Sequence, residues 1–249
     1  MARTPSAPAR RTVLRAALAL GSGGVLAPLA GCSSDGGSAA AGGPTSAAQD
    51  PAALLAKARA TLDAAPSLAF TLQGADLPEN GNVLLGGTGD LERPDGFAGT
   101  LDVRFAGVLA KVEVVSTGGT FYAKLPLTTA FSKVDPKTLG FTDPGGFMNP
   151  ETGISQLLSQ AKDPKLGGES RVVSEVVRQV TATLPGALVD DLLTSADPAQ
   201  DVAATFGITA AGELRQAELV GPFYAKGVDS TFTILLRDYG KSVQITAPA

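Results

Sequence analysis

The chain has 249 residues, a net charge of −4, no histidine and a single cysteine. Without histidine, a Ser-His-Asp or Cys-His catalytic arrangement is excluded, and zinc and copper lose their commonest ligand. One cysteine cannot form an internal disulfide, and no basic patch with interleaved aromatic residues suggests a nucleic-acid partner.

The first 31 residues have the build of an export signal. Arginines precede an uncharged apolar run over residues 16–30, which ends in small residues. The stretch Leu29-Ala30-Gly31-Cys32 resembles the lipobox of bacterial lipoproteins, whose cysteine receives a diacylglyceryl group and further acylation, palmitate included, and becomes the mature N-terminus. We therefore expect lipidation at Cys32 and a protein held on the extracytoplasmic face of the cell membrane. The alternative is a secreted protein with a chance cysteine near the cut.

Arg10-Arg11 also fits a twin-arginine export signal, and the choice between that route and the general secretory route stays open. Residues 32–49 are nearly all Gly, Ser and Ala, a composition typical of a flexible tether. The predicted organisation is a signal peptide over 1–31, a tether over 32–49 and one folded domain over 50–249.

A helix is expected at the start of that domain. Asp50 suits the N-cap, Pro51 suits the first helical position, and Ala65-Pro66 ends the periodic pattern. From Leu68 the apolar residues alternate, which predicts strands with one apolar face, and Ser116-Thr117-Gly118-Gly119 predicts a hairpin turn. The alternating apolar positions on this first set of strands are Phe70, Leu72, Leu101, Val103, Phe105, Val108, Ala110, Val112 and Val114.

The middle of the domain is expected to be a loop over 135–150, a helix over 151–162 and a strand over 172–183. A short helix follows Pro185-Gly186. The remaining predicted strands cover residues 203–209, 214–221, 230–237 and 242–246. Two groups of strands with helices between them favour an α+β fold. We expect a strongly curved antiparallel sheet, a half-barrel, with helices packed on its concave face around an apolar cavity.

Several short motifs, in order and spacing, resemble the LppX/LprA/LprF/LprG lipoproteins of mycobacteria and related actinobacteria. They cover residues 50–249 and comprise Tyr122-Ala123-Lys124-Leu125-Pro126, Val134-Asp135-Pro136, Gly140-Phe141-Thr142-Asp143-Pro144, residues 149–158, Leu184-Pro185-Gly186, Ala196-Asp197-Pro198, residues 212–216, Leu219-Val220-Gly221-Pro222-Phe223 and residues 243–248. One departure is Phe131-Ser132, where some members carry a large aromatic residue.

The resemblance implies a half-barrel whose cavity takes acylated lipids or glycolipids and carries or presents them across the cell envelope. It implies no cofactor and no metal, a membrane partner reached through the lipid anchor, and an inner-membrane lipid transporter as a further candidate partner. Thirteen apolar residues are candidates for the cavity wall: Phe70, Leu72, Leu101, Val103, Phe105, Val112, Val114, Phe121, Phe147, Met148, Ile154, Leu157 and Leu158. The same positions also fit a solid core, since both need one apolar sheet face.

Other features have more than one interpretation. Residues 143–150 are either a capped turn or a gate in which Phe147 and Met148 cover an opening. Asp190-Asp191 predicts a solvated helix face, because neighbours on a helix point apart. The tyrosines Tyr122, Tyr224 and Tyr239 are expected in strands or turns rather than as headgroup ligands.

Three function classes remain. The leading one is a non-enzymatic lipid carrier. The second is a structural or protein-docking lipoprotein with a solid core. The third is an esterase using Ser with Lys. The chain has no GxSxG motif, and its one match to the SxxK spacing is Ser159-Gln160-Ala161-Lys162.

Overall fold

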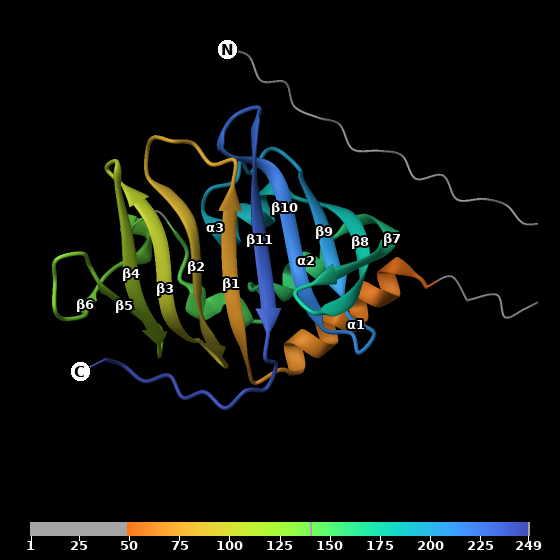
Figure 1. The fold of residues 1–249 in the computed structure, drawn as a ribbon, viewed down its shortest axis with the longest axis horizontal. Coiled ribbons are helices and arrows are strands. Elements are labelled where there is room, and N and C mark those ends of the chain that lie inside the picture. Colours follow the sequence, from red (N-terminus) through yellow and green to blue (C-terminus); the bar gives the residue numbers. More distant parts are fainter. Residues whose placement is uncertain (1–48, 140, 249) are drawn as a thin grey trace, which may run out of the picture. The chain divides into compact units, whose positions relative to one another are not determined.

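An antiparallel sheet of eleven strands is the frame of the computed structural model, which describes residues 49–139 and 141–248 (Figure 1). The expected leader, Cys32 and the tether up to residue 48 lie outside the described residues. The strands in chain order are β1 (Ser67–Ala75), β2 (Val83–Glu92), β3 (Gly96–Phe105), β4 (Val108–Thr117), β5 (Thr120–Lys124), β6 (Ser132–Lys133), β7 (Lys162–Val172), β8 (Glu175–Leu184), β9 (Val202–Ile208), β10 (Leu214–Ala225) and β11 (Val228–Arg237). Their spatial order is β6-β5-β4-β3-β2-β1-β11-β10-β9-β8-β7.

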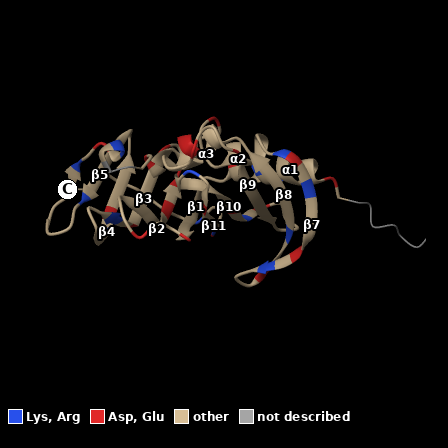
Figure 2. Ribbon diagram, turned by 90° about the horizontal axis from the view of Figure 1, so that it is seen from above, with Lys and Arg blue, Asp and Glu red and all other residues tan. Residues whose placement is uncertain are grey.

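The sheet is unclosed, because β6 and β7 are its two edges and do not pair with each other. The helices lie on one side of it: α1 (Pro51–Ala64), α2 (Ser155–Ser159), α3 (Gly186–Leu193) and the short 3-10 helices η1 (Pro136–Leu139) and η2 (Pro144–Met148). Figure 2 shows the sheet curving around α1, α2 and α3. The expectation of a curved antiparallel sheet with helices is confirmed.

Helix α1 forms as its sequence predicts. The Asp50 side chain accepts a hydrogen bond from the Ala52 N–H at 3.0 Å, and Pro51 occupies the first turn. Leu55, Ala58 and Leu62 form the buried face. The strands from Leu68, the hairpin into β5, helix α3 and the three strands that begin near Ala203, Leu214 and Ser230 are also confirmed.

Strand β2 is absent from the sequence-based expectation, because glycines interrupt its pattern. Gly89 pairs with Gly99 of β3, and the Phe97 ring lies against both. A Cβ atom added at Gly89 would lie 2.7 Å from that ring. Because glycine has no side chain, it leaves room for the fully buried Phe97 ring. This ring packs edge-on against Phe70, with 6.4 Å between ring centroids.

Replacing Gly99 is expected to destabilise the fold. A Cβ atom at this position would lie 2.2 Å from the Thr88 carbonyl oxygen, which belongs to the paired backbone and cannot rotate away. We expect Gly99→Ala to lower the free energy of unfolding by about 1–3 kcal/mol in a denaturant titration. Gly168→Ala in β7 is the matched control, since its added methyl meets no atom within 4 Å. A change within about 0.5 kcal/mol is expected there; equal losses in both would contradict the steric explanation.

Strand β7, like the two-residue strand β6, was not predicted from the sequence. It is polar, contains Pro164, and has register shifts between Lys162 and Lys165 and between Leu166 and Glu169. These are features of an edge strand that is protected against further pairing. The predicted strand over 172–183 was therefore wrong at its start: Val172 ends β7, and β8 begins at Glu175.

Two further expectations were wrong. Of the helix predicted over 151–162, only α2 forms. A tight turn, in which the Gly153 N–H donates to the Asn149 carbonyl, precedes α2, and strand β7 begins at Lys162. The strand predicted over 242–246 does not form, since β11 already pairs with β1 and β10. Instead the Ile245 N–H donates to the Glu92 carboxylate at 2.8 Å. The loop predicted over 135–150 contains η1 and η2.

Candidate functional site

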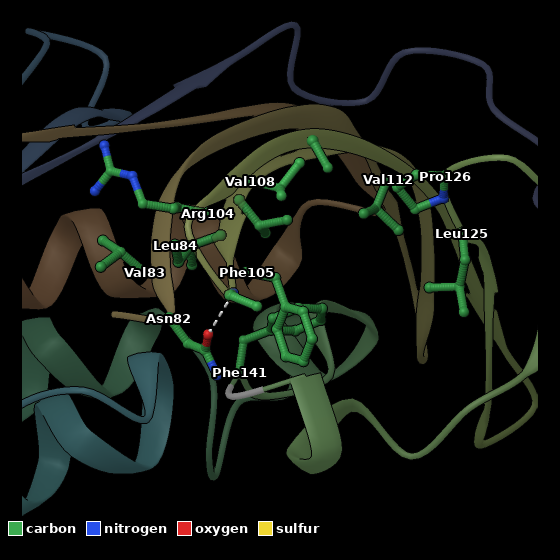
Figure 3. A pocket seen from close by; sticks show the side chains of 13 residues that line it. Asn82, Val83, Leu84, Arg104, Phe105, Val108, Val112, Leu125, Pro126 and Phe141 are labelled. Atoms are coloured by element: carbon green, nitrogen blue, oxygen red, sulfur yellow. Dashed lines mark hydrogen bonds between the residues drawn. The ribbon is translucent and has the colours of Figure 1, made fainter. Parts of the chain in front are cut away.

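An apolar pocket of about 360 Å³ opens at the end of the sheet where β3 turns into β4 (Figure 3). Its wall comes from the start of β2, the β3–β4 hairpin, the residues that follow β5 and the segment before η2. The lining residues are Asn82, Val83, Leu84, Val103, Arg104, Phe105, Ala106, Val108, Ala110, Val112, Leu125, Pro126 and Phe141. The volume lies near the lower end of the range of about 300–1,000 Å³ that is usual for ligand pockets.

The strand register explains why this wall is hydrocarbon. Val103 stands opposite Ala110, and Phe105 stands opposite Val108. Cross-strand partners share a face of the sheet, so the apolar residues of β3 and β4 together form one apolar surface. The small side chain of Ala110 leaves room between its larger neighbours.

The two polar side chains of the lining are engaged elsewhere. The Asn82 Oδ1 accepts a hydrogen bond from the Ala106 N–H at 3.0 Å and so ties the start of β2 to the hairpin turn (Figure 3). The Arg104 guanidinium donates to the Pro78 carbonyl at 2.6 Å. The pocket therefore offers a hydrocarbon ligand apolar contact without requiring that a polar group lose its partner.

Tyr224 of β10 holds the pocket wall at Leu84 through hydrogen bonds to its backbone. Its hydroxyl lies 3.2 Å from the Leu84 N–H and 3.3 Å from the Leu84 carbonyl, next to the register shift between Leu84 and Gly86. Burial raises the pKa of the Tyr224 phenol. A neutral phenol that both donates and accepts suits this place, as expected for a residue with a structural role. Tyr122 and Tyr239 also lie in or next to strands.

The interior beyond the pocket is closely packed. A void of about 20 Å³ adjoins it and shares Leu84 and Phe141 with its wall. Phe141 packs against Phe121 with 5.8 Å between centroids, and Phe147 packs against Phe70 at 5.4 Å. These rings separate the open pocket from the core under α3.

The thirteen candidate residues divide into three groups. Val103, Phe105 and Val112 line the pocket, while Phe70, Leu72, Leu101 and Phe147 line the small void. The rest are buried without lining either space: Val114, Phe121, Met148, Ile154, Leu157 and Leu158. Sequence reasoning missed Leu84, because β2 was not recognised, and Phe141, because it lies between elements; Ala110 and Val108 shared the alternation that identified Val112.

The segment with Phe147 and Met148 is a capped turn. The Asp143 carboxylate accepts from the Gly145 N–H at 2.8 Å and from the Ser116 hydroxyl at 2.8 Å, which ties η2 to β4. Both apolar side chains are buried. The capped-turn interpretation is confirmed, and a gating motion of this segment stays a hypothesis.

Asp190 on α3 gives a prediction with a defined pH dependence. Burial, and secondly the charge of Asp191, raise the pKa of this half-buried carboxyl above its ordinary value of 3.8. Because the pKa of Asp190 is higher in the native state than in the unfolded state, ionisation of this carboxyl destabilises the fold. The protonated carboxyl therefore contributes its full stability below the unfolded-state pKa, and this stability is lost as the pH rises through the native-state pKa. Asp190→Asn is therefore expected to raise the thermal midpoint at pH 7, and the gain should vanish as the pH falls below 3.8.

The control for this titration is Asp201→Asn, which removes an exposed carboxylate just before β9. Melting curves between pH 3 and 7 should show no comparable gain there. A gain for Asp190→Asn that is independent of pH would contradict the explanation.

Residues 49–139 and 141–248 contain no cluster of three or more metal-binding side chains. No helix in that part of the chain is long and apolar enough to cross a bilayer. A second hollow of about 800 Å³ is a solvent-open groove that shares Val103 and Ala110 with the pocket and also has Gln73, Asp102 and Lys111 in its lining.

These observations define a class of protein: an unclosed, curved antiparallel sheet that carries helices on one face and an apolar pocket at one end. The profile of the family described as LppX_LprAFG lipoprotein matches residues 50–245, and the chain belongs to that family. The lipoarabinomannan carrier protein LprG of Mycobacterium tuberculosis (strain ATCC 25618 / H37Rv) is 28% identical over 251 residues, which cover 99% of this chain and 98% of LprG.

Two crystal structures have the same fold. LprF from Mycobacterium bovis superposes with a TM-score of 0.67 at 17% identity, over 80% of this chain and 97% of LprF. LppX from Mycobacterium tuberculosis gives a TM-score of 0.56 at 18% identity, over 80% of this chain and all of LppX. The resemblance found in the sequence is confirmed.

Proposed function

We propose that this protein binds acylated lipids through their hydrocarbon chains and carries or presents them across the cell envelope. The observation that carries the proposal is the apolar pocket at the β3–β4 end of the sheet, whose polar side chains are already hydrogen-bonded. The relative named as a lipoarabinomannan carrier supports a lipid or glycolipid as the ligand class. We further propose that Cys32 carries the lipid anchor.

The energetics explain why such a protein needs no catalytic group. A two-chain lipid exposes on the order of 30 methylenes, and each costs about 0.8 kcal/mol in water, which gives roughly 24 kcal/mol. Sheltering even part of the chains lowers this barrier to transfer through water. Binding alone, without a bond being made or broken, is the activity that we assign to the pocket.

The volume indicates how the ligand is held. At about 360 Å³ the pocket takes part of an acyl chain as it stands. The adjoining void continues its line under Leu84 and Phe141 into the core. We infer that a longer chain enters by moving Phe141 and its neighbours aside.

Lipid extraction tests the proposal. The protein is purified from native membranes under mild conditions, extracted with organic solvent, and the extract is analysed by mass spectrometry. We expect a defined set of acylated lipids in roughly stoichiometric amount. Repeated recovery of none would overturn the carrier function.

A second candidate is a structural or protein-docking lipoprotein. The close packing of Phe70, Phe97 and Phe147 beneath the pocket favours it, because most of the sheet's inner face is solid core. Absence of bound lipid together with stable capture of one envelope protein by chemical crosslinking in cells would select this function.

A further inference from the structure

Apolar side chains project into solvent around the mouth of the pocket. Phe105, Val108 and Leu109, at the tip of the β3–β4 hairpin, are 48%, 65% and 66% exposed, and Leu127, in the loop after β5, is fully exposed. We call these four residues the apolar rim. Exposed large apolar residues scattered singly are normal, but a cluster of them marks an interaction site.

The rim is continuous with the pocket. Phe105 and Val108 line the pocket and are exposed at the same time, while Leu125 and Pro126 line it just before Leu127. A ligand chain that leaves the pocket at this end passes directly over the rim. Whatever covers the rim therefore also faces the mouth.

Leu127 is the rim residue with the least contact to the rest of the chain. Leu127 has φ = 69°, in the left-handed region, where a bulky residue is disfavoured relative to glycine or asparagine. Its side chain gains no burial in return. Packing within the chain therefore does not account for a leucine at this position.

The charge around the rim indicates what the partner is. Residues 49–248 carry 16 basic and 23 acidic side chains, yet residues 102–137 carry five basic and three acidic ones. The basic residues of that segment are Arg104, Lys111, Lys124, Lys133 and Lys137. Lys111 pairs with Asp102, and Lys124 pairs with Glu113. The segment then keeps Arg104, Lys133 and Lys137 against Asp135. An apolar tip in a segment of net positive charge complements a bilayer surface with anionic headgroups.

We propose that the apolar rim inserts into an anionic lipid bilayer, so that the pocket opens directly into the hydrocarbon layer from which an acyl chain is loaded or released. The inference rests on the proposed function and names the surface on which the pocket works. Orientation is its specific content: the β3–β4 end of the sheet faces the membrane, and the tip between β7 and β8, at the opposite end, faces away.

Tryptophan fluorescence tests this orientation, because the chain contains no tryptophan. Leu109→Trp places a single indole on the rim, and residue 109 does not line the pocket, so lipid inside the pocket does not report there. Val176→Trp, at a residue that is 49% exposed near the tip between β7 and β8, is the matched control. Both full-length proteins are purified from membranes in the acylated form and reconstituted into phosphatidylcholine–phosphatidylglycerol vesicles with brominated acyl chains.

We expect bromine quenching at position 109 that is roughly twofold or more above that at position 176, with a blue-shifted emission that needs vesicles. Equal quenching at both positions, or none at either, would overturn the proposal. A blue shift at position 109 without vesicles, in a preparation that sediments as a dimer, would assign the rim to a second copy and would overturn it as well.

Lipid extraction from the same preparations separates this inference from the proposed function. Bound lipid together with an unquenched indole at position 109 refutes the membrane-facing rim and leaves the carrier function standing. Quenching at position 109 with no bound lipid in either preparation supports the rim and refutes the carrier.

Discussion

An Ala110→Trp variant is expected to co-purify with much less lipid than the unsubstituted protein. The Ala110 side chain points into the pocket from β4, directly opposite Val103 and two residues from Val112. An indole there occupies space that an acyl chain would use. If it excludes two methylenes at about 0.8 kcal/mol each, the affinity falls by roughly fifteenfold.

Val176→Trp is the matched control for that experiment. It introduces the same side chain on β8, at a residue that is 49% exposed and lines neither the pocket nor the small void. Its lipid content should stay close to that of the unsubstituted protein, as measured by mass spectrometry against protein concentration. Similar losses in the two variants would mean that this pocket does not hold the lipid.

Protein stability is measured alongside, so that misfolding is not mistaken for lost binding. Val108→Trp offers a second substitution in the same pocket at a residue that is mostly exposed, where added volume strains the core little. A reduced lipid content with an unchanged unfolding midpoint is expected for it too.

The elements that the sequence predicted well are those whose residues carry a complete local signal. Helix α1 has a capping Asp50, Pro51 and one apolar face, and β3 and β4 alternate without interruption across a tight turn. For these elements local preference and tertiary packing agree, so pattern alone is sufficient.

The strands that escaped prediction owe their conformation to neighbours rather than to their own residues. Strand β2 is held by pairing on both sides, and its Gly89 leaves room for the Phe97 ring of the next strand. Strand β7 is polar because it is an edge. The same holds for the pocket. Its wall of β3 and β4 residues was predictable from the sequence, whereas Leu84 and Phe141 were not, because their positions depend on contacts distant in sequence.

A Phe141→Ala variant is expected to be less stable and yet to hold more lipid. Its ring forms the shared wall between the 360 Å³ pocket and the adjoining void, and it packs against Phe121. Deleting a buried phenylalanine costs about 3–5 kcal/mol, because contacts are lost and a cavity remains. Here the cavity joins the pocket, so a longer or a second acyl chain can fill it, which mass spectrometry of the extracted lipid would show.

Phe206→Ala separates enlargement of the pocket from general loosening of the fold. Phe206 is fully buried on β9 and lines neither space, so its loss of stability should match that of Phe141→Ala in a denaturant titration. Its bound lipid should keep the original chain-length profile. If both variants shifted the profile alike, greater flexibility would account for the change, and Phe141 would not be the barrier between the pocket and the core.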